Sequence, residues 1–393
     1  MLRLKLLLLS AIPALTVQPM MAGTFAVGSC KAKVPSFATI SAAVAVAPAG
    51  STIWVCPGVY PEQVTIPQSL TLAGVSDSNQ DIATITVPQT GLASNANSVF
   101  GEAIAAQVLV EGGPVNINNI AVDGTNGGLQ CAGNTWVSGI FYAPGSSGTV
   151  NHAKTNNQTN SGCSVGIWAE NADGPDRFVT VQNSSVHDID GFGIFVASGA
   201  SSPNLFASIK GNVVSLSTSA LIGIGVSNLT GSVTGNDVSN AMFGIVNTSP
   251  DVSITFNTTS LTTAGVALQG GGTVTNNRIS ASNLGAWFFS DGGVVQLNRI
   301  SNISGSAVEF NCSSAIVSGN TVNDAAVGLD NAPAGFSGAN TFNNTATVTG
   351  GGACPAAAAL KTGLAAPVSG VGTRSGASLW QWRTPASPYA SMK

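Results

Sequence analysis

Charged residues are scarce in this sequence, and their scarcity excludes several classes of protein. Only 8% of the 393 residues are Asp, Glu, Lys or Arg, and the formal net charge is −4. The 13 Lys and Arg residues form no basic stripe, so nucleic acid is not an expected partner. After the N-terminal segment, no apolar run reaches the roughly 18 residues that a transmembrane helix needs. Solubility must come from Ser, Thr and Asn side chains, as is usual in exported β-rich proteins.

The sequence between Leu221 and Asn343 repeats in steps of 20 to 22 residues. Each repeat opens with a small residue before an apolar one, and it reaches an Asn near a second short β-type run. The leading small residues are Gly223, Gly244, Gly265, Gly285, Ala307 and Gly328. The Asn residues are Asn236, Asn257, Asn277, Asn298, Asn320 and Asn340. Two independent markers keep one pitch, which indicates a solenoid of short strands.

The residue types of the repeat indicate which kind of solenoid the chain forms. Val, Ile, Thr, Gly, Asn and Ser dominate, and no helix-length apolar periodicity fits within one repeat. The pattern predicts an all-β fold, a single-stranded right-handed parallel β-helix, whose coils lie about 4.8 Å apart with equivalent residues stacked. An Asn turned inward at a bend could bond the Asn of the next coil and free backbone groups, although Asn is also a common turn residue.

Both ends of the chain differ from the repeat. Residues 1–22 place two basic residues before an apolar run, which predicts a secretory signal peptide, with an uncleaved anchor as the alternative. The expected β-helix domain spans 23–350, and a low-complexity tail or cap spans 351–393, with Trp380 and Trp382 as its anchor. We expect a monomer that is secreted, periplasmic or on the cell surface, with no transmembrane segment after the signal peptide.

The six cysteines agree with export, because an even number in an exported chain favours disulfides. Six cysteines permit about 15 pairings. Neighbouring coils bring consecutive cysteines close together, and their spacings are too long and irregular for a zinc site. The expected disulfides are Cys30–Cys56, Cys131–Cys163 and Cys312–Cys354.

Residues 36–75 predict a cap for the open end of the solenoid. They read SFATISAAVAVAPAGSTIWVCPGVYPEQVTIPQSLTLAGV. Ser36 or Thr39 can cap a short helix through Ala47, and short strands follow around a Pro57-Gly58 turn. The order T-I-x-x-A-V, P-G-x-Y-x-E-x-V-x-I and L-T-L-x-G resembles the opening coils of secreted pectin methylesterases. It also resembles the wider group of pectin-lyase-like β-helix proteins.

This resemblance implies a secreted β-helix and a bias toward uronate-rich glycans, but it supplies no catalytic set. The D-F-I-F-G motif of pectin methylesterases is absent, and the nearest segment, Gly193–Ala197, lacks the Asp. The paired-Asp and Gly-His-Gly motifs of polygalacturonases are absent as well. So is the catalytic Arg motif of pectate lyases.

Upstream of Gly223 the repeat is stretched, with leading glycines 27, 27 and 30 residues apart. Extra residues must leave the coils as loops, and such loops often wall the binding face of a solenoid. The loops expected from this spacing are residues 142–160, 171–176 and 197–204.

An aromatic residue follows an Ile in each of the stretched coils. If the Ile side chains point inward, strict alternation turns Phe141, Trp168 and Phe195 outward on adjacent coils. The sequence thus predicts an exposed aromatic strip that packs on sugar rings, with Trp287 and Phe289 as a second set on the same face. The alternative is that the long loops cover these rings as a satellite core.

The few charges concentrate in the same coils and suggest two kinds of catalysis. A lyase of this fold abstracts a proton with Lys or Arg beside a neutralised uronate, roles that Lys210 and Arg177 could fill. A hydrolase needs two facing carboxylates, such as Glu170 with Asp173 or Asp188.

The turn after Val186 offers a third possibility. His187 could act as a base, and Asp188 with Asp190 could hold a hard cation such as Ca²⁺ through their carboxylates. A solvated bend is the alternative interpretation of the same residues. No cofactor is certain from the sequence.

Arg278 and Arg299 each follow a ladder Asn and should stack one coil apart. Two like charges about 5 Å apart repel unless an anion or a carboxylate lies between them. A polyanionic glycan is one possible partner, which makes both residues candidates for substrate binding. Splaying of the two side chains into water is the other interpretation.

Three functions remain open from the sequence. The first is binding of an extracellular, uronate-rich polysaccharide along the coils between residues 139 and 230. The second is a polysaccharide lyase or carbohydrate esterase that uses the same face. The third is a surface adhesin or structural solenoid without such a site.

Overall fold

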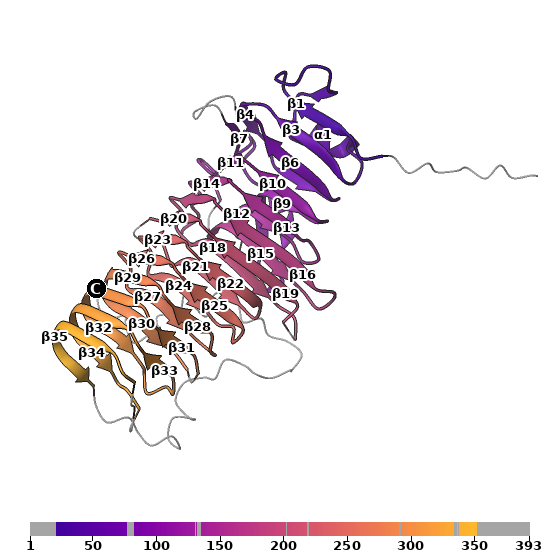
Figure 1. The fold of residues 1–393 in the computed structure, drawn as a ribbon. Helices are drawn as coiled ribbons and strands as arrows, with labels where there is room; N and C mark the ends of the chain where they lie inside the picture. Colours follow the sequence, from indigo (N-terminus) through magenta and orange to yellow (C-terminus); the bar gives the residue numbers. More distant parts are fainter. Residues whose placement is uncertain are drawn as a thin grey trace, which may run out of the picture.

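The chain folds into an elongated stack of coils, with α1 and β1 at one end and β35 at the other (Figure 1). The computed structural model describes residues 21–76, 82–129, 131, 135–201, 203–217, 220–290, 292–333, 336 and 338–351. The expected signal peptide, apart from its last two residues, lies outside this part of the chain. The expected tail after residue 351 also lies outside it. Within the described residues, no helix is long and apolar enough to cross a membrane.

One wall of the stack is sheet A, whose solenoid strands pair in parallel in chain order. Its strands, in spatial order, are β2 (Ser36–Phe37), β1 (Thr24–Val27), β3 (Ser51–Val55), β6 (Leu70–Gly74), β10 (Val115–Asn118), β13 (Gly148–Asn151), β16 (Arg177–Gln182), β19 (Leu205–Lys210), β22 (Thr230–Thr234), β25 (Val252–Thr255), β28 (Thr273–Thr275), β31 (Val294–Gln296) and β33 (Ile316–Ser318).

The other walls of the stack belong to sheet B, which consists of two rows of parallel strands. The first row is β4 (Gly58–Pro61), β7 (Ala83–Thr86), β11 (Ile120–Asp123), β14 (Lys154–Asn156), β17 (Ser185–His187), β20 (Val213–Ser215), β23 (Asp237–Ser239), β26 (Thr258–Ser260) and β29 (Arg278–Ser282). The second row is β5 (Val64–Ile66), β9 (Ala103–Val110), β12 (Thr135–Tyr142), β15 (Ser164–Asn171), β18 (Phe192–Ser198), β21 (Ile222–Ser227), β24 (Phe243–Asn247), β27 (Ala264–Leu268) and β30 (Leu284–Phe288). The long strands β32 (Arg299–Glu309), β34 (Thr321–Asp330) and β35 (Thr341–Gly350) extend both rows.

Each coil thus contributes one strand to sheet A and one to each row of sheet B, which is the predicted right-handed parallel β-helix. The expected loop at 142–160 is wrong in part, because β13 and β14 lie within it. These two strands supply the sheet A and first-row positions of their own coil. The wider spacing of glycines therefore does not reflect one continuous loop there.

The ladder Asn residues fill the bend between sheet A and the first row, as predicted. The amide of Asn257 donates to Oδ1 of Asn277 at 3.0 Å and to the carbonyl of Val233 at 2.8 Å. The backbone N–H of Asn257 also donates to Asn277 Oδ1, at 2.8 Å. The same links run from Asn212 to Asn340. A buried polar column therefore satisfies the backbone at this corner.

The leading glycines stand where the chain has no room for a side chain. A Cβ on Gly244 would lie 2.5 Å from the carbonyl oxygen of Gly265 in the next coil. The following Ile or Val, such as Ile245 and Val266, is fully buried inside the coils. Glycine therefore permits close stacking at this point, and the next residue begins the apolar core.

A short helix lies at the N-terminal end, as expected. The helix α1 (Ile40–Val46) begins after Thr39, whose hydroxyl accepts from the backbone N–H of Ala42 at 3.2 Å. Glu62 accepts from the N–H of Ile40 at 2.8 Å and holds the helix on the first coil. The expected Pro57-Gly58 turn instead leads directly into β4.

Two of the three expected disulfides are present, Cys30–Cys56 and Cys131–Cys163. Cys312 is also disulfide-bonded. Its expected partner, Cys354, lies outside the described residues, so the Cys312–Cys354 pairing stays a prediction.

Candidate functional site

The expected aromatic strip exists as a column, but it is not exposed. Phe141 pairs in register with Trp168, and Trp168 with Phe195, on β12, β15 and β18. Their ring centroids lie 5.3 and 6.0 Å apart. Phe141 and Trp168 are 0% exposed, and Phe195 is 6% exposed. The expectation of an open sugar-binding strip is therefore wrong for this structure. The rings form a satellite core, as in the alternative, but a hairpin outside the expected loops covers part of it.

A hairpin covers part of this column. The strand β8 (Ala96–Asn97) pairs antiparallel with the start of β9, so the turn between them folds back over the outer surface of the second row. Phe100 in that turn lies against Phe195, with ring centroids 6.5 Å apart. Val99 lies over Gly199, where an added Cβ would be 2.8 Å from the Val99 side chain. Residues 94–102 are called the cover hairpin below.

The cover hairpin is joined to β15 through the carboxyl group of Glu170. Glu170 Oε1 accepts from the Ser98 hydroxyl at 2.7 Å, and Oε2 accepts from the Val99 N–H at 2.9 Å. The side chain is 1% exposed, and this burial raises the pKa of Glu170 to about 8. The buried Glu102 raises that pKa further, while hydrogen bonds from Val99, Ser98 and Trp168 lower it. Burial dominates, so Glu170 holds its proton at neutral pH.

The second aromatic set is also largely covered. Trp287 continues the same outward column and is 6% exposed, with Phe289 3.7 Å away between ring centroids. In the next two coils the column continues with Glu309 and Asp330. Burial and the nearby Asp330 raise the pKa of Glu309, against hydrogen bonds from Asn311 and Asn331 that lower it. This end of the column therefore combines two neighbouring carboxyl groups, Glu309 and Asp330, with the aromatic rings of Trp287 and Phe289.

The four expected catalytic residues do not converge. Arg177 and Lys210 lie at opposite ends of the paired strands β16 and β19 in sheet A, about 16 Å apart along the strand direction. His187 ends β17 in the first row of sheet B, and Glu170 is buried on the second row. One substrate group cannot reach all four, so the structure does not assemble the lyase or hydrolase set that the sequence suggested.

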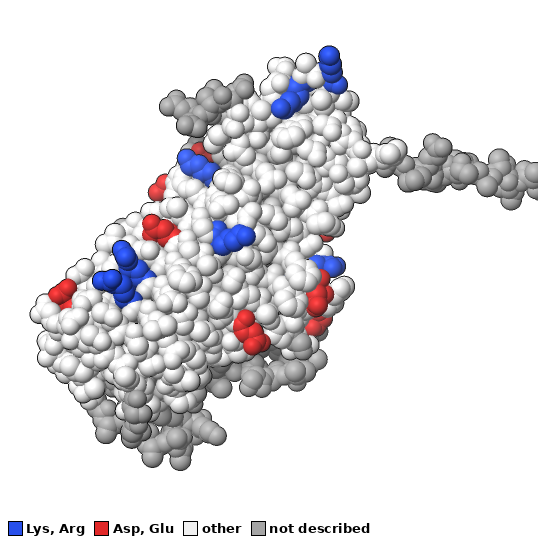
Figure 2. Space-filling model, viewed as in Figure 1, with Lys and Arg blue, Asp and Glu red and all other residues white. Residues whose placement is uncertain are grey.

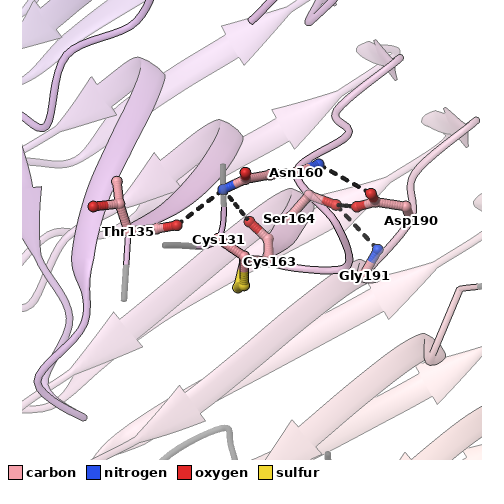
Figure 3. Close-up of a disulfide and its surroundings, with 7 residues drawn as sticks. All are labelled: Cys131, Thr135, Asn160, Cys163, Ser164, Asp190 and Gly191. Carbon is pink, nitrogen blue, oxygen red and sulfur yellow. Dashed lines mark hydrogen bonds between the residues drawn. A yellow bond between two sulfur atoms is a disulfide. The ribbon is translucent and has the colours of Figure 1, made fainter. Parts of the chain in front are cut away.

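The expected metal ligands have other partners. His187 Nδ1 lies 2.7 Å from Asp188 Oδ2 on the surface. Asp190 binds across to the preceding coil: its Oδ1 accepts from the Ser164 hydroxyl and its Oδ2 from the Asn160 N–H (Figure 3). Across the described ranges, no three His, Cys, Asp or Glu side chains gather as a metal site.

Figure 3 shows that both carboxylate oxygens of Asp190 already accept hydrogen bonds from the preceding coil. The same network includes the Gly191 N–H, which donates to Ser164 Oγ at 3.0 Å, and the Asn160 amide, which donates to the Thr135 carbonyl at 2.9 Å. The disulfide of Cys163 lies beside it. Asp190 thus anchors the turn into β18 to the coil before it, which is a structural role.

Arg278 and Arg299 stack one coil apart, as predicted, on the first row. Both side chains are exposed, and neither forms an ion pair within the described part of the chain. Thr258 and Thr321 occupy the same column on the flanking coils. Figure 2 shows how rare other charges are on the face that it presents.

A surface aromatic pair that the sequence analysis missed lies on sheet A, with Phe178 exposed and Phe206 half-buried. Phe178 on β16 pairs in register with Phe206 on β19, and their rings stack with centroids 5.0 Å apart and planes 17° apart. Phe178 is 62% exposed. The signal was the alternation in the segments RFVTVQ and LFASIK, which buries Val179 and Val181 and turns the Phe outward.

Polar columns run beside this pair on the same surface. Thr180 pairs with Ser208 one step along the strands, and Gln182 pairs with Lys210 one step further. Alternate residues of a strand are about 6.6 Å apart, and neighbouring strands about 4.8 Å. The surface therefore offers stacked rings at one end, hydroxyls in the middle, and an amide with an ammonium at the other end.

Solved structures similar to this chain share its fold. The A-module of the Azotobacter vinelandii mannuronan C-5 epimerase AlgE6 matches with a TM-score of 0.53 and 17% identity, over 76% of this chain and 87% of that one. The GH136 lacto-N-biosidase of Eubacterium ramulus matches with a TM-score of 0.52 and 11% identity, over 84% and 68%. A PL6 alginate lyase in complex with a trisaccharide matches with a TM-score of 0.50 and 13% identity, over 79% and 73%.

No protein-family model and no curated protein matches the sequence. At these identities the structural similarity establishes the right-handed parallel β-helix fold alone.

Proposed function

We propose that this protein binds an extracellular, uronate-containing polysaccharide on the outer surface of sheet A. The observation that carries the proposal is the stack of the exposed Phe178 on the half-buried Phe206. Large apolar side chains on a soluble surface favour contact with a partner, and the C–H faces of sugar rings pack well on aromatic rings.

The polar columns beside the rings fit a sugar chain that lies along the strands. Thr180 and Ser208 can hydrogen-bond its hydroxyls, as the polar groups of a binding site do when they fix orientation. Lys210 is exposed at the far end and can pair with a carboxylate. A uronate bound there would lie about 13 Å from the aromatic pair, which leaves room for more than one sugar ring between them.

The comparisons support a carbohydrate ligand without identifying it. The similar structures named above are described as a mannuronan epimerase, a lacto-N-biosidase and an alginate lyase. Two disulfides and a surface poor in charge agree with the proposed location outside the cytoplasm. The stacked Arg278 and Arg299 add a second place where an acidic chain could bind.

The first test compares the wild type with the variant F178A/F206A. Each ring contributes about 1 kcal/mol beyond its buried area, so the double variant should bind its polysaccharide at least about tenfold more weakly. The measurement is affinity electrophoresis on uronate-containing and neutral polysaccharides, with and without Ca²⁺. Unchanged retention of the double variant would refute sheet A as the binding surface.

The matched control is F256N, which removes a lone Phe that is 64% exposed on another turn. Phe256 has a φ of 59°, a conformation that Asn tolerates, so the fold should not change. Its retention should equal that of the wild type. A parallel K210Q variant should lose affinity only for acidic polymers and should show a weaker dependence on salt.

A polysaccharide-active enzyme, lyase or esterase, is the second candidate function. The observation that favours it is Glu170, a carboxyl group that keeps its proton at neutral pH, as a general acid must. Mass spectrometry of polysaccharides incubated with the protein would detect unsaturated oligosaccharides or lost acyl or methyl groups. If products form and E170Q forms them at the wild-type rate, this role of Glu170 is excluded.

A further inference from the structure

The cover hairpin is anchored at its base and held at its turn by few contacts. At the base, Ala96 pairs with Ile104 and Asn97 with Ala103, and the Asn95 side chain exchanges hydrogen bonds with the backbone of Ala106 at 2.9 and 3.0 Å. Beyond β8 its turn is held to β15 by the two hydrogen bonds to Glu170 and by apolar contact of Phe100 and Val99. Ser98 organises the turn itself, because its hydroxyl oxygen also accepts from the Phe100 N–H at 3.0 Å.

The protonation state of Glu170 decides whether this attachment is favourable. A neutral carboxyl group can share its proton with the Ser98 hydroxyl and still accept from the Val99 N–H. An ionised one would leave a negative charge in an apolar site, 1% exposed, with the buried carboxyl of Glu102 nearby. Two hydrogen bonds do not offset the loss of water around such a charge.

We propose that the protonation state of Glu170 controls the cover hairpin. The neutral Glu170 carboxyl group holds the hairpin over the aromatic column, and ionisation of that group releases the hairpin. Opening would remove Phe100 from Phe195 and bring water to Glu170. The surface uncovered in this way would be aromatic and apolar with a carboxylate at its edge. It lies on the second row of sheet B, so the proposal is independent of binding on sheet A.

The direction of the pH dependence follows from linkage. With the hairpin open, Glu170 is hydrated and has the ordinary carboxyl pKa of 4.5, while in the closed state its pKa is raised to about 8. The closed state is therefore fully favoured below 4.5 and loses its advantage as the pH rises towards 8. The ratio of closed to open hairpin should fall by up to about tenfold per pH unit within this window and level off above it.

Glu102 is the one charged group, among the described residues, that acts on the Glu170 carboxyl. It belongs to the cover hairpin, whereas β15 and β18 present Trp168, Asn171, Ala197 and Ser198 around that position, and a hydrogen bond from Trp168 lowers the pKa of Glu170. The charge of Glu102 disfavours ionisation of Glu170 in the closed state.

The test is hydrogen exchange of the full-length mature protein at pH 5 and pH 8, reported as protection factors so that the intrinsic pH dependence cancels. The amides of residues 98–100, in the turn beyond β8, should lose at least about a hundredfold of protection between the two values. E170Q keeps the acceptor for Val99 and a donor for Ser98 but cannot ionise. Its protection should change less than threefold over the same range.

The matched control is E309Q, on the outward column of Trp287 in a distant coil, where Glu309 also has a raised pKa. It should lose protection of residues 98–100 as the wild type does. S98A should lower protection already at pH 5. The proposal is overturned if wild-type protection is equal at the two pH values, if E170Q declines as the wild type does, or if S98A has no effect.

Discussion

A column of Asn side chains, from Asn212 to Asn340, turns inward at the bend between sheet A and the first row of sheet B. Each middle member accepts two hydrogen bonds from the Asn of the preceding coil and donates to backbone carbonyls. An amide is suited to this position because it carries both donors and acceptors on one short side chain. At the residue scale, a repeated Asn side chain therefore supplies the hydrogen bonds of this polar corner.

Removing one Asn should show how much the column contributes to the free energy of unfolding. N277A leaves the backbone N–H of Asn257 without its acceptor, removes one of the acceptors of the Asn257 amide, and removes the bond to Asn298. We expect the free energy of unfolding to fall by about 2–5 kcal/mol, measured by urea denaturation. The neighbouring N276G, at an exposed position with a φ of 59°, should change it by less than about 1 kcal/mol. A loss no larger than that of the control would contradict the role assigned to the column.

The short strands of the second row owe their spacing to the leading glycines. The site of Gly244 on β24 is closed by the carbonyl oxygen of Gly265 and by the side chain of Thr259, both within 3.2 Å of a Cβ built there. At Ala307 the same position carries a side chain, in a strand where the pairing register shifts between Ile303 and Ser306. At the element scale, the local register thus decides whether a methyl group is tolerated.

Exchange of these residues gives a paired prediction. G244A should destabilise the protein by about 1–3 kcal/mol, because backbone of the next coil must move. A307G should cost only about 1 kcal/mol, from the added freedom of glycine in a strand and the lost methyl group. Thermal unfolding of both variants, followed by circular dichroism, would measure the difference. Equal shifts in Tm would show that the close contact at Gly244 relaxes freely.

The cover hairpin shows the limit of reasoning from single elements. Strict alternation correctly turned Phe141, Trp168 and Phe195 away from the interior of the coils. Part of their cover is a turn near residue 99, in a segment without the repeat, which contacts Phe195. The sequence of the aromatic strands could not reveal this cover, because the bond between Ser98 and Glu170 that holds it joins residues 72 positions apart. Phe178 and Phe206 obey the same alternation, yet Phe178 remains exposed and Phe206 is only half-buried, a difference that only the tertiary structure reveals.

The whole molecule is a one-dimensional stack, in which the strand contacts of a coil are almost all with its neighbours. A substitution in one coil should therefore destabilise that coil and its neighbours and leave distant coils unchanged. The Cys30–Cys56 disulfide closes a loop between residues 26 apart in the sequence, beside β1 and β3. By the loop-closure relation it stabilises this end by about 3 kcal/mol.

The variant C30S/C56S tests this independence. Protection from hydrogen exchange should fall in α1, β1 and β3, whereas β22 to β31 should keep their wild-type values. Mass spectrometry of peptic fragments would resolve the two regions. Loss of protection at both ends together would show instead that the solenoid unfolds as a single cooperative unit.

The sequence alone determined the β-helical coil, because the interactions that form the coil are local and recur in every repeat. The period of the glycines and Asn residues, the alternation of apolar residues, the N-terminal helix after Thr39 and two disulfides all depend on near neighbours or on the next coil. The tertiary structure decided which outward positions meet water. The hairpin over Glu170, the separation of Lys210 from His187 and the exposure of Phe178 arise from contacts between distant segments, for which the repeat carries no signal.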